Sequence, residues 1–160
     1  MLRLKPDYNI ESIYDIDIEH LIEYGIKAIF FDLDSTVMKS KSGKFSFRTI
    51  QFLNDLRRNF KIAIITNNSR TEYIELVRSQ TDIPVYAGAK KPNPETLLKA
   101  CDDLNITVND AVMVGDRPLS DILAGKKAGT MTILVDSISK DEESSIVRFA
   151  RFLERLAIEK

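Results

Sequence analysis

Short runs of apolar residues alternate along the chain with longer stretches in which apolar and polar residues follow helical spacing. The runs are rich in β-branched and aromatic residues and contain few polar positions, which is typical of parallel strands buried on both faces. They predict strands at residues 27–33, 61–66, 83–86, 111–114 and 131–135.

The stretches between these runs predict helices. Apolar residues recur at helical spacing in residues 47–56, 74–77 and 94–104, where Pro94 is a typical first residue of a helix, and 118–127 predicts a shorter one. Strands that alternate with helices are joined by right-handed crossovers. We therefore expect an α/β protein with a three-layer, Rossmann-like fold around a central parallel sheet.

The chain is predicted to form one unit, because no repeat, low-complexity tract or linker divides its 160 residues. We expect a single domain at 1–160, with a lead-in at 1–26 and a C-terminal amphipathic helix at 141–160. The apolar residues of that helix predict either docking on the sheet or contact with anionic lipid at a membrane surface.

Composition narrows the classes of function. A net charge of -1 gives no strong signal for nucleic-acid binding, and the single cysteine excludes an internal disulfide. The apolar runs are far shorter than the roughly 18 residues that suggest a membrane-spanning helix. The first residues lack the apolar stretch of a secretory signal, so we expect a cytoplasmic protein, with peripheral membrane contact if the C-terminal helix binds lipid.

Chemically informative residues follow the predicted strands. Ligands of parallel α/β sheets bind at the carboxyl ends of the strands, so these residues are expected to converge. A carboxylate directly after a buried strand is costly without a cation nearby. Each residue also has a structural interpretation as a turn former, a helix cap or a solvated loop residue. The residues are Asp32, Asp34, Thr66, Asn67, Lys91, Asp116 and Asp121.

The cluster suits metal-assisted chemistry on phosphate. Carboxylate and carbonyl oxygens without nearby His or Cys favour Mg²⁺, a hard cation that pairs with substrate phosphate. A carboxylate can attack phosphorus and form an aspartyl-phosphate, if cations and N–H groups stabilise the transferring group. A second carboxylate can protonate the leaving alcohol and then activate water.

Four stretches resemble the motifs of the haloacid dehalogenase (HAD) superfamily, in the family's order. Asp32-Leu-Asp-Ser-Thr36 resembles motif I, Thr66 motif II, Lys91-Pro92 motif III, and Gly115-Asp116 with Asp121 motif IV. The segments at 12–27 and 148–155 are similar to those of the YqeG-type subfamily IIIA, so nearly the whole chain is covered. Relatives in that subfamily include phosphatidylglycerophosphate phosphatases, which make phosphatidylglycerol.

The resemblance implies a Mg²⁺-dependent phosphomonoester hydrolase with an aspartyl-phosphate intermediate. Its implied catalytic residues are the nucleophile Asp32, the general acid/base Asp34, Thr66 and Lys91. The implied metal site consists of Asp32, Asp34 through its backbone carbonyl, Asp116, and Asp121 either directly or through water. The implied phosphate-binding set is Asp32, Leu33, Asp34, Thr66, Asn67 and Lys91, where Lys91 is favoured over Lys90 because it directly precedes proline.

Spacing predicts that no cap domain covers the site. About thirty residues separate Asp34 from Thr66, which is enough for one helix but not for an inserted domain. An open site suits a bulky phosphorylated substrate, such as a lipid headgroup or a macromolecule. Three alternatives remain: a capless phosphatase for another substrate, a non-catalytic module, and a receiver-like signalling domain. The receiver is disfavoured because residues 83–88 lack the aspartate that it needs there; the sequence predicts no oligomeric state.

Overall fold

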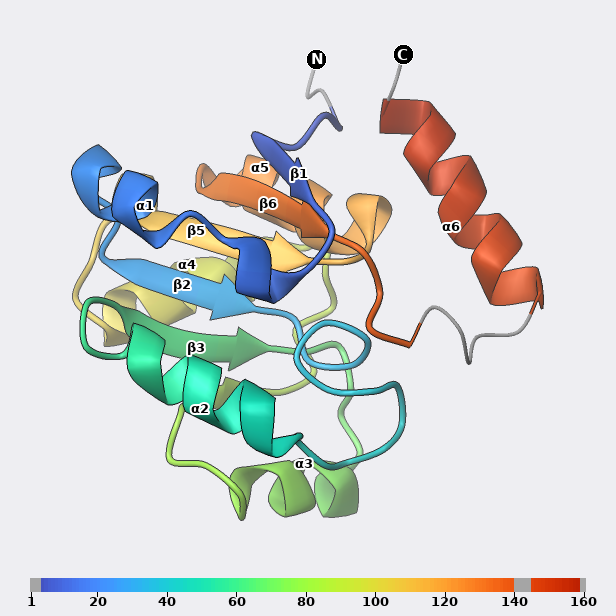
Figure 1. Ribbon diagram of the computed structural model, residues 1–160, viewed down its shortest axis with the longest axis horizontal. Helices are drawn as coiled ribbons and strands as arrows, with labels where there is room; N and C mark the ends of the chain where they lie inside the picture. The colour runs from blue at the N-terminus through green and yellow to red at the C-terminus, as the bar shows by residue number, and fades with distance from the viewer. Residues whose placement is uncertain (1–3, 140–144, 159–160) are drawn as a thin grey trace.

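Within the described residues, six parallel strands form one sheet in the order β1-β6-β5-β2-β3-β4 (Figure 1). The computed structural model describes residues 4–139 and 145–158. The strands are β1 (Tyr8–Ile10), β2 (Ala28–Phe31), β3 (Lys61–Ile65), β4 (Val85–Tyr86), β5 (Ala111–Gly115) and β6 (Met131–Val135). The predicted central parallel sheet is confirmed.

The middle of the sheet is apolar on both faces. Every residue of β2 and of β5 is buried, and β2 pairs with β5 on one side and with β3 on the other. β2 ends at Phe31, two residues before the predicted end, because the chain turns there. The Leu33 carbonyl accepts the backbone N–H groups of residues 36–38, which closes this turn.

The strand β1 was not predicted, since residues 1–26 were expected only to lead into the sheet. It pairs with β6 at the sheet edge, and its first two residues are exposed. The Asp7 carboxylate ties it to β6 by accepting hydrogen bonds from Thr132 N (2.8 Å) and Thr132 Oγ1 (3.1 Å). A short, half-exposed edge strand leaves no apolar run in the sequence.

Helices cover both faces of the sheet, as the three-layer prediction requires (Figure 1). One apolar cluster contains Leu21, Leu53 and Ile74 from α1, α2 and α3, and a second contains Leu97 and Ala124 from α4 and α5. The helices are α1 (Ile18–Tyr24), α2 (Phe47–Leu56), α3 (Thr71–Arg78), α4 (Glu95–Asp103), α5 (Leu123–Ala128) and α6 (Ser145–Ile158), with short turns η1 (Ile13–Asp15), η2 (Val108–Asp110) and the π-helical η3 (Pro118–Ile122).

The last helix, α6, lies beyond the carboxyl ends of the strands (Figure 1). Of the helix predicted at 141–160, residues 141–144 and 159–160 lie outside the described residues. Its large apolar residues are largely exposed rather than packed on the sheet, so the choice between docking and lipid contact stays a prediction. Ile146 is 81% exposed and Phe149 is 61% exposed, whereas Glu154 is buried. Within the described residues, no helix has the length and apolar character needed to cross a membrane.

Candidate active site

The sequence-predicted residues meet in one cavity of about 660 Å³ at the carboxyl ends of the strands. The exception is Leu33, whose side chain is buried in the hydrophobic core while its carbonyl closes the turn after β2. The predicted residues that line the cavity are Asp32, Asp34, Thr66, Asn67, Lys91, Asp116 and Asp121. In the part of the chain that the structure describes, no second domain covers them.

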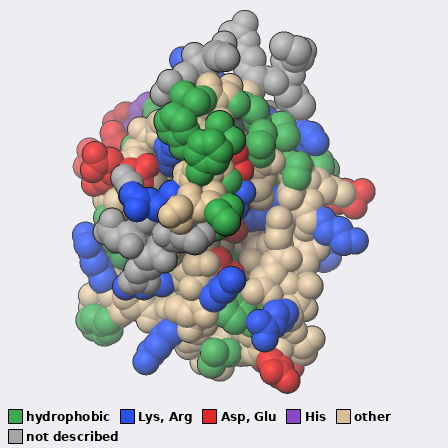
Figure 2. All heavy atoms as spheres, turned by 90° about the vertical axis from the view of Figure 1, so that its right-hand side faces the viewer, with side chains coloured by type: hydrophobic (Ala, Val, Ile, Leu, Met, Phe, Trp, Pro, Cys, Tyr) green, Lys and Arg blue, Asp and Glu red, His purple; other side chains and the backbone are tan. Residues whose placement is uncertain are grey.

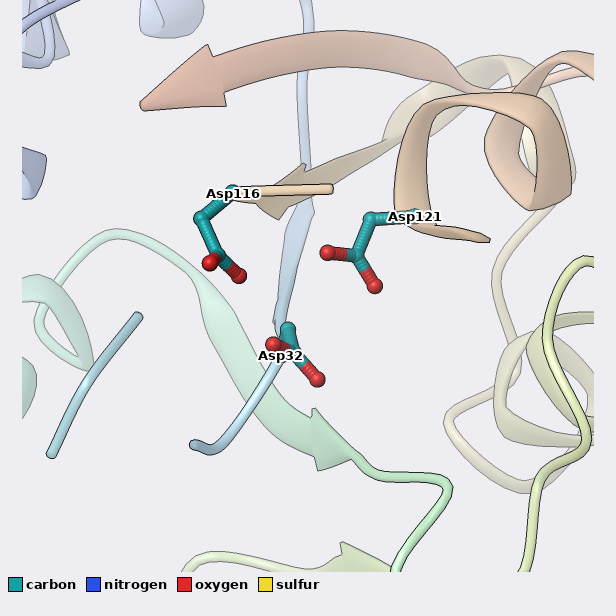
Figure 3. A group of neighbouring side chains, drawn as sticks. All are labelled: Asp32, Asp116 and Asp121. Carbon is teal, nitrogen blue, oxygen red and sulfur yellow. The ribbon is translucent and has the colours of Figure 1, made fainter. Parts of the chain in front are cut away.

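Three aspartates converge from separate segments (Figure 3). Asp32 follows β2, Asp116 follows β5, and Asp121 lies in η3; one carboxylate oxygen of each lies within 4.8 Å of the others. Gly115 permits this approach. A Cβ atom at that position would lie 2.3 Å from Asp121 Cγ, which no side chain tolerates.

Lys91 supplies a buried cation between two of these carboxylates. Its Nζ donates hydrogen bonds to Asp32 Oδ1, Asp121 Oδ1 and the Ile65 carbonyl, each at 2.7 Å. Burial alone would lower the pKa of Lys91, but the charges of Asp121 and Asp32 outweigh that effect and raise it, so the ammonium stays protonated. Lys90 is exposed and takes no part in this network.

Asn67, which lies in the loop after β3, holds the backbone of Lys91 through two side-chain hydrogen bonds. Its Oδ1 accepts the Lys91 N–H at 2.7 Å, and its Nδ2 donates to the Lys91 carbonyl at 3.1 Å. Thr66 is buried beside it, and its Oγ1 accepts the Asn68 N–H at 3.1 Å. The loop after β3 therefore positions the lysine through Asn67 and presents Thr66 to the cavity.

The acidic cluster carries more negative charge than Lys91 can neutralise. Burial, together with the charges of Asp32 and Asp121, raises the pKa of Asp116 well above its usual value, although Arg151 and Thr36 lower it. Burial and the charge of Asp32 raise the pKa of Asp121 to about 6 against the opposing effect of Lys91. Carboxyl groups whose pKa is raised by burial and like charge are stabilised in their ionised form by a nearby cation.

The donor set fits a hard divalent cation. All three candidate ligands are carboxylates. Asp116 Oδ2 is buried without a hydrogen bond from any described residue and forms an ion pair with the Arg151 guanidinium. The other oxygen, Asp116 Oδ1, lies 3.0 Å from Thr36 Oγ1. Because the Arg151 guanidinium already pairs with Asp116 Oδ2, a metal ion that bound this oxygen would take the place of that cation.

The sequence did not indicate the partners of Asp34. Asp34 Oδ1 accepts hydrogen bonds from the Tyr73 hydroxyl at 2.5 Å and from Lys41 N at 3.0 Å. Burial and the contact with Asp34 raise the pKa of Tyr73, so that it remains a proton donor to the carboxylate. Tyr73 adjoins the apolar stripe of α3, and no short motif distinguishes it from a packing residue.

Two arginines near the site were also missed. Arg151 of α6 lines the cavity, and the Arg117 N–H donates to Asp121 Oδ2 at 3.1 Å. Arg117 could have been suspected from its place beside Asp116. Arg151 could not, because it lies 35 positions after the nearest motif residue it contacts.

The parallel α/β fold carries three converging carboxylates and a buried ammonium at the ends of its strands, an acidic site whose donor set suits a cation. A family model for haloacid dehalogenase-like hydrolases matches residues 46–129. The chain is also 30% identical over 151 residues to "Probable phosphatase YqeG" of Bacillus subtilis (strain 168), covering 94% of this chain and 87% of that protein. The chain belongs to the haloacid dehalogenase-like hydrolase family.

Two further comparisons agree with this result. Phosphatidylglycerophosphate phosphatase 1, chloroplastic/mitochondrial, of Arabidopsis thaliana is 28% identical over 165 residues, covering 93% of this chain but only 45% of that protein. A crystal structure of a protein from Listeria monocytogenes serotype 4b has the same fold, with a TM-score of 0.57, 22% identity, and coverage of 68% of this chain and 78% of that one. The family and these relatives support a phosphatase enzyme.

Proposed function

We propose that the chain is a Mg²⁺-dependent phosphomonoester hydrolase that works through an aspartyl-phosphate on Asp32. The observation that carries the proposal is the position of Asp32. Its carboxylate receives the buried Lys91 ammonium on one oxygen and lies within 4.8 Å of the carboxylates of Asp116 and Asp121. A nucleophile, a fixed positive charge and a cation-binding set therefore share one cavity.

Asp32, Asp116 and Asp121 would hold the Mg²⁺ ion, with the backbone carbonyl of Asp34. When bound, the ion supplies positive charge to the transferring phosphoryl group. An Asp32 oxygen forms a bond to phosphorus while the bond to the leaving oxygen breaks, and protonated Asp34 gives that oxygen its proton. Asp34 then removes a proton from water, which attacks phosphorus and releases phosphate and free Asp32.

The other residues stabilise charge and position groups in this scheme. Lys91 neutralises the phosphoryl oxygens and Asp32, and Asn67 keeps the lysine in place through its two backbone contacts. Tyr73 and the Lys41 N–H orient Asp34 by hydrogen bonds to one of its oxygens, which leaves the other oxygen for proton transfer. Thr66 and the backbone after Leu33 would hold the remaining phosphate oxygens.

Turnover of p-nitrophenyl phosphate with Mg²⁺ tests the reaction. We expect Asp32→Asn to lower kcat by at least about 10³-fold, since it removes the nucleophile, while circular dichroism and thermal melting confirm the fold. Asp15→Asn, a change of the same kind in η1 away from the cavity, should leave kcat unchanged. Equal rates for wild type and Asp32→Asn would remove Asp32 as the nucleophile.

For the substrate, we propose a lipid phosphomonoester such as phosphatidylglycerophosphate at an anionic bilayer, reached from the cytoplasmic side. The Arabidopsis relative carries that substrate in its name. The outward face of α6 is apolar, with Phe149 and Phe152 61% and 55% exposed. Figure 2 looks onto the carboxyl ends of the strands and shows hydrophobic side chains gathered near the top of this face, with Lys and Arg side chains around them.

The positive charge around the cavity also supports an anionic lipid as the partner. The loops that follow β2, β3 and β4 border the cavity and carry exposed cationic side chains, and Arg148 is exposed on α6. Apolar and cationic groups on one face are the combination that binds anionic lipid. The cationic side chains in the loops are Lys39, Lys41, Lys44, Arg70 and Lys90.

Vesicle flotation and a substrate panel test this assignment. We expect binding to phosphatidylglycerol-rich vesicles and not to phosphatidylcholine vesicles, with loss of binding in the double variant Phe149→Ser/Phe152→Ser. Phe47→Ser, which changes another exposed phenylalanine on α2, should bind like wild type. Phosphatidylglycerophosphate in mixed micelles should be the best substrate. Preference for a soluble phosphate ester, or self-association through α6 in place of vesicle binding, would contradict the lipid assignment.

A further inference from the structure

The inward face of α6 carries charged side chains that contact the body of the protein. Arg117 Nη2 donates to Glu154 Oε1 at 2.7 Å, and Arg155 Nη2 donates to the Val135 carbonyl at 3.2 Å and pairs with Asp136 at 3.0 Å. These contacts fasten the helix to the ends of β5 and β6. Because partly exposed ion pairs contribute little stability, α6 is held more weakly than the helices that pack apolar residues on the sheet.

One contact on this face reaches the acidic site itself. Arg151 Nη1 forms an ion pair with Asp116 Oδ2 and donates to the Asp116 carbonyl at 3.3 Å. The Arg151 side chain is 13% exposed and the Asp116 side chain 1%. The guanidinium therefore occupies the one buried carboxylate oxygen of the site that receives no hydrogen bond from a described residue.

Arg151 and a divalent cation would use the same oxygen. Both are positively charged, and in a buried cavity two cations on one carboxylate oxygen repel strongly. A metal ion that takes Asp116 Oδ2 must therefore displace the guanidinium. Since Arg151 is one of the residues that attach α6 to the rest of the described chain, its displacement weakens the attachment of the helix.

We propose that Arg151 is an internal counter-ion that holds Asp116 until a divalent cation takes its place, so that cation binding loosens α6. This inference rests on the metal site of the proposed function. Linkage makes the coupling reciprocal: whatever draws α6 away from the site, such as its apolar face entering a bilayer, strengthens cation binding to the same degree. The site would then bind Mg²⁺ most tightly where α6 is engaged elsewhere.

Calorimetric titration of the full chain with Mg²⁺ tests the competition. We expect Arg151→Gln to lower the Kd for Mg²⁺ by on the order of tenfold, within the usual range of coupling between linked sites. Arg148→Gln is the matched control, because it removes the same charge from the exposed face of the same helix and should leave the Kd unchanged. An unchanged or weakened Mg²⁺ affinity in Arg151→Gln would overturn the proposal and would assign Arg151 to substrate or structure instead.

Amide hydrogen exchange of wild type gives a second readout that needs no variant and no turnover. We expect saturating Mg²⁺ to speed exchange in residues 145–158 several-fold while β2 and β5 stay protected. Unchanged or slower exchange in α6 would also overturn the proposal. Failure of the proposed function is distinguishable, since in that case wild type and Asp116→Asn would both bind no Mg²⁺, and the metal site would fall together with the counter-ion.

Discussion

The acidic cluster at the strand ends and the inner face of α6 contain the same kinds of charged groups but are built differently. In the cluster, Lys91 and Asp121 are each 1% exposed and are fixed by β5, η3 and the loop after β4. At α6, Glu154 of the helix pairs with Arg117, which precedes η3, and the Arg117 and Glu154 side chains are 42% and 10% exposed. Water cannot reach the Lys91–Asp121 pair to replace either partner, whereas it can reach the Arg117–Glu154 pair.

This difference in exposure determines how easily an ion pair can be broken. A buried cation between carboxylates is costly to remove, because the charges left behind cannot be solvated. A half-exposed pair can open at little cost, because water replaces each partner. The cluster is therefore suited to holding Asp32 in place. The Arg117–Glu154 pair can open to water, whereas the Arg151–Asp116 pair, whose side chains are 13% and 1% exposed, opens only when another cation replaces the guanidinium.

The largest expected effect on stability and turnover comes from removing the buried cation of Lys91. Lys91→Met leaves Asp32 and Asp121 without their shared partner, so we expect about 3–5 kcal/mol less stability in urea unfolding and loss of p-nitrophenyl phosphate turnover. Lys90→Met, one position earlier but exposed, should unfold and turn over like wild type. Similar losses in the two variants would show that burial of the charge is not what distinguishes them.

A smaller loss of stability is expected from adding a side chain at Gly115, where the missing Cβ lets Asp121 lie close to β5. In Gly115→Ala the new Cβ meets Asp121 Cγ, so η3 must shift, and we expect about 1–3 kcal/mol of destabilisation with loss of Mg²⁺ binding. Adding Asp121→Ala should recover most of the stability but not Mg²⁺ binding. Stability losses that simply add in the double variant would exclude the clash as the cause.

The pH dependence of stability sharpens the comparison further. Asp121 ionises near its usual pKa of 3.8 when unfolded but has a folded pKa of about 6. The folded protein therefore binds more protons over that interval, so its stability falls as pH rises from about 4 to 6. Urea unfolding in EDTA should show a steeper decline for wild type than for Asp121→Asn. Mg²⁺, which binds the ionised carboxylates, should reverse it; parallel curves without metal would exclude Asp121 as the titrating group.

The strand-end cluster could be predicted from the sequence because parallel topology alone brings the ends of β2, β3 and β5 to one edge. Apolar runs define those strands in the sequence, so the residues that follow each strand can be identified directly. The partners of these residues could not be predicted. Tyr73 and Arg151 reach the site from helices whose packing depends on tertiary structure, and β1 left no apolar run. The amphipathic pattern of α6 was correct, but the pattern does not say which face turns inward.

The smallest expected effect on stability comes from changing the outward face of α6. Phe149→Ser/Phe152→Ser removes two large apolar side chains, yet both are more than half exposed, so we expect thermal and urea stability within about 0.5 kcal/mol of wild type. Phe60→Ser, the same change at a position 4% exposed, should cost about 3–5 kcal/mol because it leaves a cavity and a buried hydroxyl. A large loss in the α6 variant would mean that the helix packs its phenylalanines against the protein in solution. The ion pairs of its inner face would then be secondary, and the helix would not be free to respond to a cation at Asp116.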